Sequence, residues 1–323
     1  MLRIHFTSED LTRVRLTAGM DPMWEIVLSR FRLHDPDLPL AFRPWRAKLR
    51  GVTGLRASAG VLATLAPKLP YFPDFLTPAE GEETLDAGLD AIMTTPRERL
   101  HAELARLRTQ TVLPAWVDSV ADGTGLRAVT EALRAYHDVA IAPFRPVIEG
   151  SIDADRAHRT RSLLNGGIEG LLATLRPLVR WRPPVLEVAC DVERTVRLRG
   201  RGLRLRPSFF CQRNAVSLAN PDLPPVLVYP IAQEYRWVRP GAGDSALPAL
   251  LGRARAAVLR TVDDGRTTSQ IAGMLGMSVA SASRHTGVLR AAGFIDSRRD
   301  GPAVLHRLTP LGAALLSRVG RDS

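Results

Sequence analysis

The chain has 323 residues, of which 45% are hydrophobic and 24% are charged, and its formal net charge is +11 at pH 7. These values are ordinary for a soluble globular protein. The length is sufficient for about two domains, each with a hydrophobic core large enough to be stable without disulfide bonds. The N-terminal MLRIHFTSED carries charge at once, and no stretch approaches ~18 uninterrupted apolar residues, which argues against a secretion signal and a membrane span. We therefore expect a cytoplasmic protein with no membrane partner.

The basic balance is compatible with a polyanionic partner, but its composition weakens that inference. Lysine occurs only at Lys48 and Lys68, and such a preference for arginine is typical of a GC-rich genome. The distribution of charge is more informative. Residues 247–323 contain 11 arginines and 5 aspartates, a net charge of +6 from less than a quarter of the chain.

The first part of the chain predicts a strand followed mainly by helices. LRIHF at Leu2–Phe6 is strand-like, residues 7–10 offer N-caps for a short helix, and Pro22 begins a helix that runs to about His34. Residues 35–82 are rich in proline and glycine and carry no clear pattern. A helical block from Glu83 to about Trp181 contains the predicted helices Pro96–Leu107, Gly125–Ile141 and Ala154–Val179, the last with a kink at Gly166-Gly167 and an apolar stripe of Leu163, Leu164, Ile168, Leu171, Leu172, Leu175 and Val179.

After Pro183-Pro184 the pattern changes from helical to alternating. Val185–Val188 and Val226–Tyr229 are predicted strands, and Arg194–Arg206 is a predicted hairpin that turns at residues 200–202. Its apolar residues would face inward and its arginines outward, namely Arg197, Arg199, Arg204 and Arg206. We interpret these arginines as a guard against edge pairing, and a second nucleic-acid contact is the alternative.

The composition of RPGAGDS at residues 239–245 is typical of a linker. We therefore place a first domain at 1–240, a linker at 241–246 and a second domain at 247–323. The first domain, mainly helical with a small β section, would serve dimerisation, effector sensing or both. The predicted fold class of the whole chain is α+β.

Cys190 and Cys211 are the two cysteines of the chain. They lack the short spacing of a zinc or redox site, so we predict two largely buried thiols, with a single disulfide as the alternative. We predict no metal and no cofactor.

From residue 247 onward the pattern predicts a helix, a second helix, a glycine turn, a third helix, a hairpin and a last helix. Gly276 would form the turn, and Ser278 would cap the third helix. Asp300-Gly301 is a strong two-residue hairpin signal, and Thr309 would cap the last helix. This order is typical of a winged helix-turn-helix. Its three helices would be Leu250–Val262, Ser269–Leu275 and Val279–Ala292, and its wing would be formed by the strands Phe294–Arg299 and Ala303–Leu308. The last helix would carry an apolar stripe that could pair with a second subunit, namely Leu311, Ala314, Leu315 and Val319.

The third helix would bury Val279, Ala282, Thr286 and Leu289 and would expose short polar groups beside one arginine. Such side chains can reach base edges and phosphates in the major groove. No acidic residue occurs from Met274 to Phe294. With the wing, the predicted contacts to double-stranded DNA are Thr268, Ser269, Ser278, Ala280, Ser281, Ser283, Arg284, His285, Val288, Arg298, Arg299, His306 and Arg307.

The run IAGMLGMSVASASRHTGVLRAAGFIDSRRDG, followed by HRLTPLGAALL, resembles the DNA-binding domain of the ArsR family of winged-helix regulators. The resemblance covers roughly a quarter of the chain and departs from the family at Thr286, where leucine is usual. RIHFTSEDL and LPPVLVYP in the long N-terminal region resemble extended actinobacterial members. The resemblance implies a homodimeric transcriptional regulator. The metal ligands of the sensing branches are not carried over, because no cysteine follows Cys211 and Leu311–Val319 contains no ligand.

Other classes of protein find less support. The sequence contains no phosphate-binding loop, no nucleophile elbow and no HExxH motif. His101-Ala102-Glu103 imitates a deaminase signature, but no PCxxC follows, so we interpret it as a solvated helix face. We therefore expect no enzyme but a sequence-specific regulator, with a small-molecule effector of the first domain as a possible partner. The alternatives are a ligand-independent architectural DNA-binding protein and an enzyme that dimerises through its winged helix.

Overall fold

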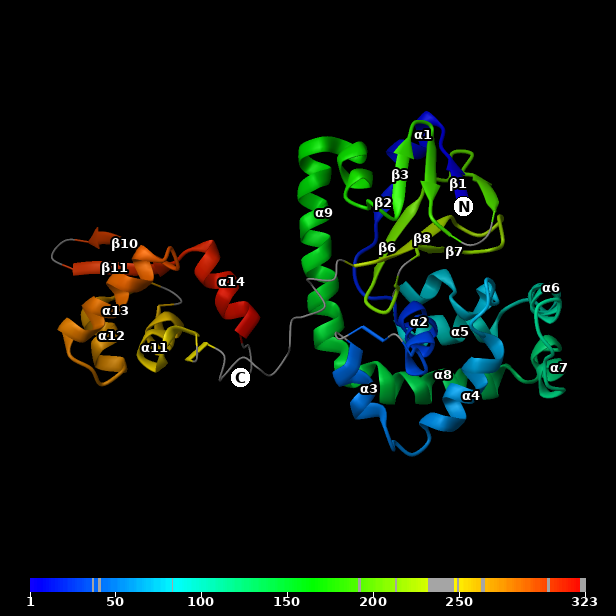
Figure 1. Cartoon of the computed structure of the whole chain (residues 1–323), viewed down its shortest axis with the longest axis horizontal. Coiled ribbons are helices and arrows are strands. Elements are labelled where there is room, and N and C mark those ends of the chain that lie inside the picture. Colours follow the sequence, from blue (N-terminus) through cyan, green and yellow to red (C-terminus); the bar gives the residue numbers. More distant parts are fainter. Residues whose placement is uncertain are drawn as a thin grey trace. The chain divides into compact units, whose positions relative to one another are not determined.

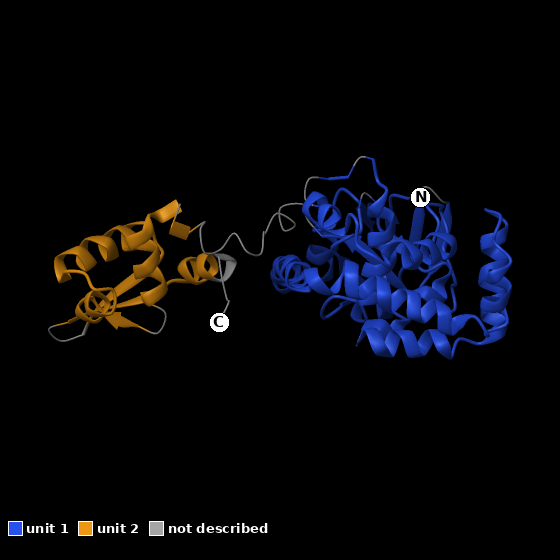
Figure 2. Cartoon of the chain, turned by 90° about the horizontal axis from the view of Figure 1, so that it is seen from below, with its two compact units in different colours: residues 1–237 blue, residues 238–323 orange. Residues whose placement is uncertain are grey.

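The computed structural model divides the chain into two compact units, residues 1–237 and residues 238–323 (Figures 1 and 2). The structure describes residues 1–36, 38–39, 42–82, 84–190, 193–212, 214–231, 247–248, 250–262, 265–300 and 303–319. The predicted linker at 241–246 lies outside these residues. Helices and strands both contribute to the chain, which therefore belongs to a mixed class compatible with the predicted α+β fold.

Helices make up most of the first unit between residues 8 and 173. Helix α1 begins at a cap that the sequence predicts, and α2 begins at Pro22 as predicted, with Asp21 as its cap. The hydroxyl of Thr7 accepts a hydrogen bond from the backbone N–H of Asp10 at 3.2 Å, and Asp21 accepts one from Met23 at 2.9 Å. The helices are α1 (Ser8–Thr12), α2 (Pro22–Leu33), α3 (Arg43–Leu49), α4 (Leu55–Leu65), α5 (Leu85–Met93), α6 (Arg97–Arg108), α7 (Trp116–Ala121), α8 (Leu126–Ala140) and α9 (Arg145–Ala173), with short 3₁₀ turns η2 (Asp74–Leu76), η3 (Ala79–Glu82) and η4 (Ala142–Phe144).

Helix α9 confirms the predicted kink but ends earlier than expected. Gly167 has φ +59° and interrupts the helix, as the Gly-Gly pair predicts. Six residues of the predicted stripe, from both sides of this break, pack in one core, namely Leu163, Ile168, Leu171, Leu172, Leu175 and Val179. Leu164 is the exception and is 79% exposed. The helix ends at Ala173, and Val179, predicted as its last residue, instead begins a strand that pairs with Val188.

The strands of the first unit form two four-stranded sheets. The first sheet has the order β3-β4-β1-β5, and in it β1 lies antiparallel to β4 and parallel to β5. The second has the order β2-β6-β8-β7. N-terminal strands therefore pair with strands from the other end of the unit, and the helices α2–α9 are inserted between them. The strands are β1 (Leu2–His5), β2 (Arg15–Leu16), β3 (Val179–Arg182), β4 (Val185–Val188), β5 (Arg194–Arg197), β6 (Arg204–Ser208), β7 (Val216–Ser217) and β8 (Val226–Pro230).

The predicted hairpin at Arg194–Arg206 is wrong. Its halves are β5, which pairs with β1 in the first sheet, and β6, which pairs with β2 and β8 in the second. Gly200 and Gly202 do turn the chain, with φ +82° and +71°. The partners of both strands, however, come from distant parts of the sequence, so the turn carries the chain from one sheet to the other.

The sheet β2-β6-β8-β7 is covered on both faces. Along β8, Leu227 and Tyr229 belong to a core shared with the first sheet, while Val226 and Val228 belong to the core of the helical layer. This alternation explains the uninterrupted apolar run at this strand, since neither face meets water. In Figure 1 the sheets lie on one side of the helical layer, and α9 runs beside both.

Strand β6 carries a charge into this interior. The side chain of Arg206, predicted to face outward, is only 3% exposed and forms ion pairs with Asp21 and, at 2.8 Å, with Glu82. Burial lowers the pKa of the Arg206 guanidinium to about 10, so it stays charged at neutral pH. The outward prediction fails at Arg206 because this part of the doubly covered sheet has no solvent face, whereas the side chain of Arg204 at the start of β6 is 43% exposed.

A second buried acid holds the end of the same strand. Glu25 on α2 is 1% exposed. Its carboxylate accepts hydrogen bonds from the backbone N–H of Phe209 at 2.9 Å and of Phe210 at 3.0 Å, and from the hydroxyl of Ser208 at 3.1 Å. Helix α2 is thus joined to the sheet through charge-assisted hydrogen bonds.

The second unit is built from short elements around its own core. Its helices and strands are α11 (Arg253–Thr261), β9 (Arg266–Thr267), α12 (Thr268–Met274), α13 (Val279–Ala291), β10 (Ile295–Asp300), β11 (Ala303–Leu308) and α14 (Pro310–Val319). The core contains Val258 and Leu259 from α11 and Ile271 from α12. The predicted helix at Leu250–Val262 is broken by Gly252, whose φ is +82°, and Leu250 is 69% exposed rather than buried.

Replacing the buried acid of α2 tests whether it joins the two layers. We expect Glu25→Ala to lower the free energy of unfolding of the first unit by about 2–5 kcal/mol, because two buried N–H groups and a hydroxyl lose their acceptor. Urea unfolding followed by tryptophan fluorescence measures this loss. The control is Glu98→Ala on the exposed face of α6. A loss for Glu25→Ala no larger than that of the control would contradict this account.

Candidate nucleic-acid interface

Helices α12 and α13 are joined by a tight turn at Gly276. This glycine has φ +61°, which places it in the left-handed region. The backbone N–H of Met277 donates to the carbonyl of Ala272 at 3.0 Å, and that of Gly276 donates to Gly273 at 3.4 Å. These two bonds form a Schellman cap, which ends α12 and redirects the chain. The hydroxyl of Ser278 then accepts from the N–H of Ser281 at 3.2 Å and caps α13.

Helix α13 has one buried face and one open face. Ala282, Thr286 and Leu289 are buried, as the sequence predicts. Val279, predicted to be buried with them, is 53% exposed, because it lies in the first turn beyond the reach of the core. Of the predicted contact residues on this helix and at its cap, Ser278, Ala280, Ser283, Arg284 and Val288 are exposed, while Ser281 and His285 are half-buried.

Strands β10 and β11 form the predicted antiparallel hairpin, with Asp300 opposite Ala303. The exposed side chains of Arg298 and Arg299 come near its tip, and the side chain of Arg307 is exposed on the return strand. Because neighbouring residues in a strand point to opposite faces, Arg298 and Arg299 lie on different faces of the hairpin. Arg307 shares the face of Arg298, since it stands opposite Asp296 in the register.

His306 does not belong to the exposed set. It is 4% exposed, and both ring nitrogens are engaged: Nε2 lies 2.9 Å from the hydroxyl of Thr268, and Nδ1 lies 2.8 Å from that of Ser297. The prediction of a DNA contact at His306 is therefore corrected, because its ring joins β10, β11 and α12. Its spacing of two from the half-buried Leu308 is the sequence signal that indicates an inward side chain.

The N-terminus of α12 carries the other two predicted contacts. Thr268 is half-buried with its hydroxyl at His306, and Ser269 is exposed. Thr267 caps the helix in a reciprocal capping box with Gln270. Of the two predicted contacts at this helix end, Ser269 is therefore the one with an exposed side chain.

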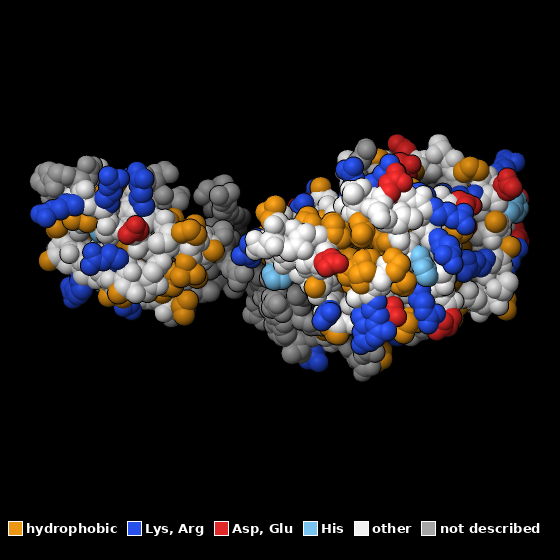
Figure 3. Space-filling view, turned by 90° about the horizontal axis from the view of Figure 1, so that it is seen from above, with side chains coloured by type: hydrophobic (Ala, Val, Ile, Leu, Met, Phe, Trp, Pro, Cys, Tyr) orange, Lys and Arg blue, Asp and Glu red, His pale blue; other side chains and the backbone are white. Residues whose placement is uncertain are grey.

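The charged residues of α12, α13 and the segments beside them are all basic. From residue 265 to residue 295 the charged side chains are Arg266, Arg284 and Arg290, with no acid among them. Figure 3 shows basic side chains prevailing over acidic ones on one face of this unit. A polyanion would meet little repulsion there.

Neither a metal site nor an HxE active site is found among the described residues. No group of three or more His, Cys, Asp or Glu is placed to hold an ion in this part of the chain. Cys190 and Cys211 are not joined by a disulfide, as predicted. His101 is exposed, but Glu103 is buried, which corrects its placement on a solvated face. The carboxylate of Glu103 accepts from the backbone N–H of Phe75 at 2.7 Å.

In the segments that the structure describes, no helix is both long enough and apolar enough to cross a membrane.

Comparison of the chain with family models, with curated proteins and with solved structures found no match.

The burial of the His306 ring leads to a testable prediction about the pKa of its imidazole. Burial, together with the nearby charge of Arg290, lowers the pKa of His306. As the pH falls through ~6.5, the imidazole of His306 takes up a proton in the unfolded chain before it does so in the folded chain. The contribution of His306 to the stability of the second unit is therefore complete above that pH and is lost progressively below it. NMR titration of the histidine rings in the full chain, with His306→Gln to assign the signal, should give a pKa below 6.5. A value at or above 6.5 would contradict the arrangement.

Proposed function

We propose that this chain is a sequence-specific DNA-binding transcriptional regulator whose second unit is a winged helix-turn-helix. The observation that carries the proposal is the capped pair α12–α13, joined at Gly276, with the open face of α13 free of acids. In such a pair the first helix braces the second, which enters the major groove. The hairpin β10–β11 follows directly and would be the wing.

The side chains on α13 suit base reading. Arg284 is exposed one turn after the capped N-terminus, and an arginine there can donate two hydrogen bonds to a guanine. The small side chains of Ala280 and Ser283 let the helix approach the groove. The arginines of the hairpin would meet phosphates, which fix position and carry no sequence information. Recognition and positioning are thus assigned to different elements.

The resemblance to ArsR-family regulators supports the same function and adds a homodimer. The proposal also places this regulator in the cytoplasm. Leu311, from the stripe predicted for pairing, is 56% exposed at the start of α14. Sedimentation of the full chain tests the dimer. The proposal includes no catalytic activity and no metal.

A ligand-independent architectural DNA-binding protein is the second candidate. It is favoured by the basic surface itself, since charge alone binds DNA without regard to sequence. Selection of bound duplexes from a random pool separates the two: a palindromic consensus supports the dimeric regulator, and the absence of any consensus supports the architectural protein.

The role of Arg284 is tested by its removal. We expect Arg284→Ala to weaken binding to the selected sequence by about 10–100-fold and to leave binding to scrambled duplexes nearly unchanged, since a bidentate base contact is worth roughly 1–3 kcal/mol. The matched control is Arg290→Ala, an equal loss of charge from the exposed C-terminal end of the same helix. Equal weakening of both duplexes by Arg284→Ala would show that this residue does not read bases.

The role of the hairpin is tested separately. We expect the double change Arg298→Ala, Arg299→Ala to weaken binding to all sequences alike and to flatten the salt dependence by about 1–2 units of slope, because fewer counterions are displaced. Titration at several salt concentrations measures both effects. Since the two arginines lie on different faces, each single change identifies which one meets a phosphate. Loss of specific binding alone would mean that the hairpin reads sequence.

A further inference from the structure

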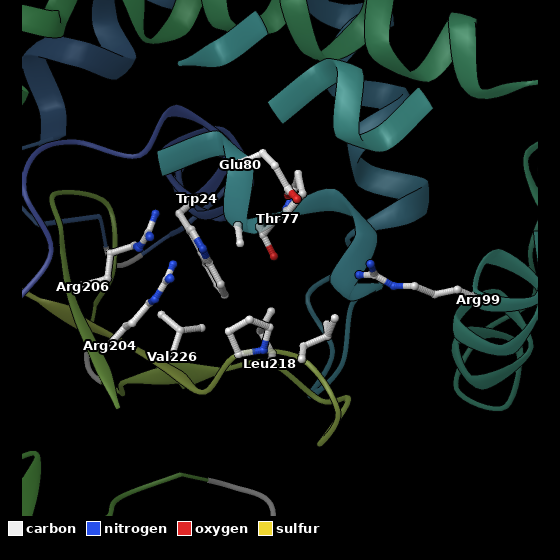
Figure 4. A pocket seen from close by; sticks show the side chains of 12 residues that line it. Trp24, Thr77, Glu80, Arg99, Arg204, Arg206, Leu218 and Val226 are labelled. Atoms are coloured by element: carbon white, nitrogen blue, oxygen red, sulfur yellow. The ribbon is translucent and has the colours of Figure 1, made fainter. Parts of the chain in front are cut away.

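Two pockets open between the helical layer and the strands of the first unit. The smaller, of about 150 Å³, lies beside α2 and is shown in Figure 4. Arg204 and Arg206 on its wall pair with Glu82 at 3.2 and 2.8 Å, and Arg99 pairs with Glu103 at 2.6 Å. Its positive charges are thus already neutralised within the protein, so we assign it no ligand.

The larger cavity, of about 590 Å³, is built differently. Its walls come from residues 69–74, α6, the start of β5 and the β7 segment, which are distant in the sequence. Part of the lining is apolar, with Leu2, Leu69, Phe72 and Val216. A cavity of this size at the junction of two layers is typical of a small-molecule site.

Two arginines, Arg106 and Arg194, lie on this wall. Among the described residues, neither Arg106 nor Arg194 forms a salt bridge. The guanidinium of Arg194 is held by the carbonyl of Leu218 at 2.6 Å and the hydroxyl of Ser217 at 3.1 Å. That of Arg106 lies over the ring of Tyr71, 4.4 Å from its centroid. Burial lowers the pKa of Arg194, and the charge of Arg106 contributes to the same shift, while the charge of Asp74 opposes it. Arg194 is thus attracted by Asp74 and repelled by Arg106.

Asp74 is the one acid among the described residues that line the cavity, and its carboxylate is held by backbone hydrogen bonds. Asp74 is 3% exposed, and its carboxylate accepts from the backbone N–H of Ala219 at 2.9 Å and of Asn220 at 2.6 Å. It therefore fixes the loop after β7. The described residues that line the cavity include two arginines and one aspartate, a net charge of +1, which suits a ligand with one negative charge.

We propose that this cavity binds a small organic monocarboxylate, with its anionic group between Arg106 and Arg194 and its apolar body against Leu2, Phe72 and Val216. A carboxylate matches the planar fork of a guanidinium and would relieve the repulsion between the two cations. The proposal does not rest on DNA binding, and its test measures the ligand alone.

Cys190 provides a local reporter. It lines the cavity and is half-buried, whereas Cys211, the other cysteine, is 1% exposed. We expect octanoate and phenylacetate to slow the alkylation of Cys190 in the full chain by neutral iodoacetamide, measured by mass spectrometry of the cysteine peptide. The uncharged octanamide and phenylacetamide should give no protection. Calorimetry with the same compounds gives the dissociation constants.

Substitutions of single arginines test which side chains bind the carboxylate. Arg106→Gln should weaken carboxylate binding by about tenfold or more, because a charged hydrogen bond is lost. Arg97→Gln, an exposed arginine on the same helix that does not line the cavity, should bind as the unmodified chain does. Arg194→Gln is a second test, and its melting temperature without ligand is measured first because this side chain also holds β7.

Several outcomes would overturn the proposal. Equal protection of Cys190 by the uncharged amides would mean that the cavity does not recognise the negative charge of the ligand. Tighter binding of phenyl phosphate or inorganic phosphate than of either carboxylate would assign the site to phosphate instead. Unchanged affinity in Arg106→Gln, or no binding of either carboxylate, would also refute it.

Discussion

The first unit depends on one constraint. Strand β6 is an inner strand of a sheet that is covered on both faces, so its buried polar groups must find hydrogen-bond or ion-pair partners inside the protein. Two acids on or beside α2 are such partners, Asp21 at the guanidinium of Arg206 and Glu25 at the backbone of Phe209 and Phe210. Buried charges tolerate little displacement, because each costs several kcal/mol when its partner moves away. The position of the helical layer on the sheet is therefore fixed at α2, and the two pockets lie along the junction that these bonds hold together.

Local signals predicted those helices that have clear caps or turns, but they missed α3 and α4 in the segment 35–82. The pairing of the strands could not be predicted, because it joins segments that are distant in the sequence. The start of α2 follows from Asp21 and Pro22, and the end of α12 follows from Gly276, because caps and turns involve neighbours in the sequence. The alternation in Arg194–Arg206 predicted two strands correctly. Their partners, however, include β1 and β2 from the first sixteen residues, and the segment itself carries no pattern that identifies these partners. Parallel pairing of distant strands is set by the whole fold rather than by a local pattern.

The same distinction applies to the sites. Ser278, Gly276 and the apolar positions of α13 lie close together in the sequence, so the helix pair could be predicted with its exposed face. His306 was misplaced because residue type, rather than strand periodicity, decided its assignment. The large cavity could not be predicted at all. Arg106 and Arg194 stand 88 positions apart and come together only because α6 and β5 meet at the junction of the two layers.

Charge divides the chain in a way that bears on the proposed function. Residues 247–323 carry +6 of the total of +11, which leaves +5 for the first 246 residues. Attraction to a polyanion falls off within about 10 Å at ordinary salt, so the density of charge matters more than its total. The second unit would then supply most of the non-specific affinity for DNA. A ligand in the first unit would change DNA binding only if it bound more tightly to one of two states of the protein that differ in their affinity for DNA.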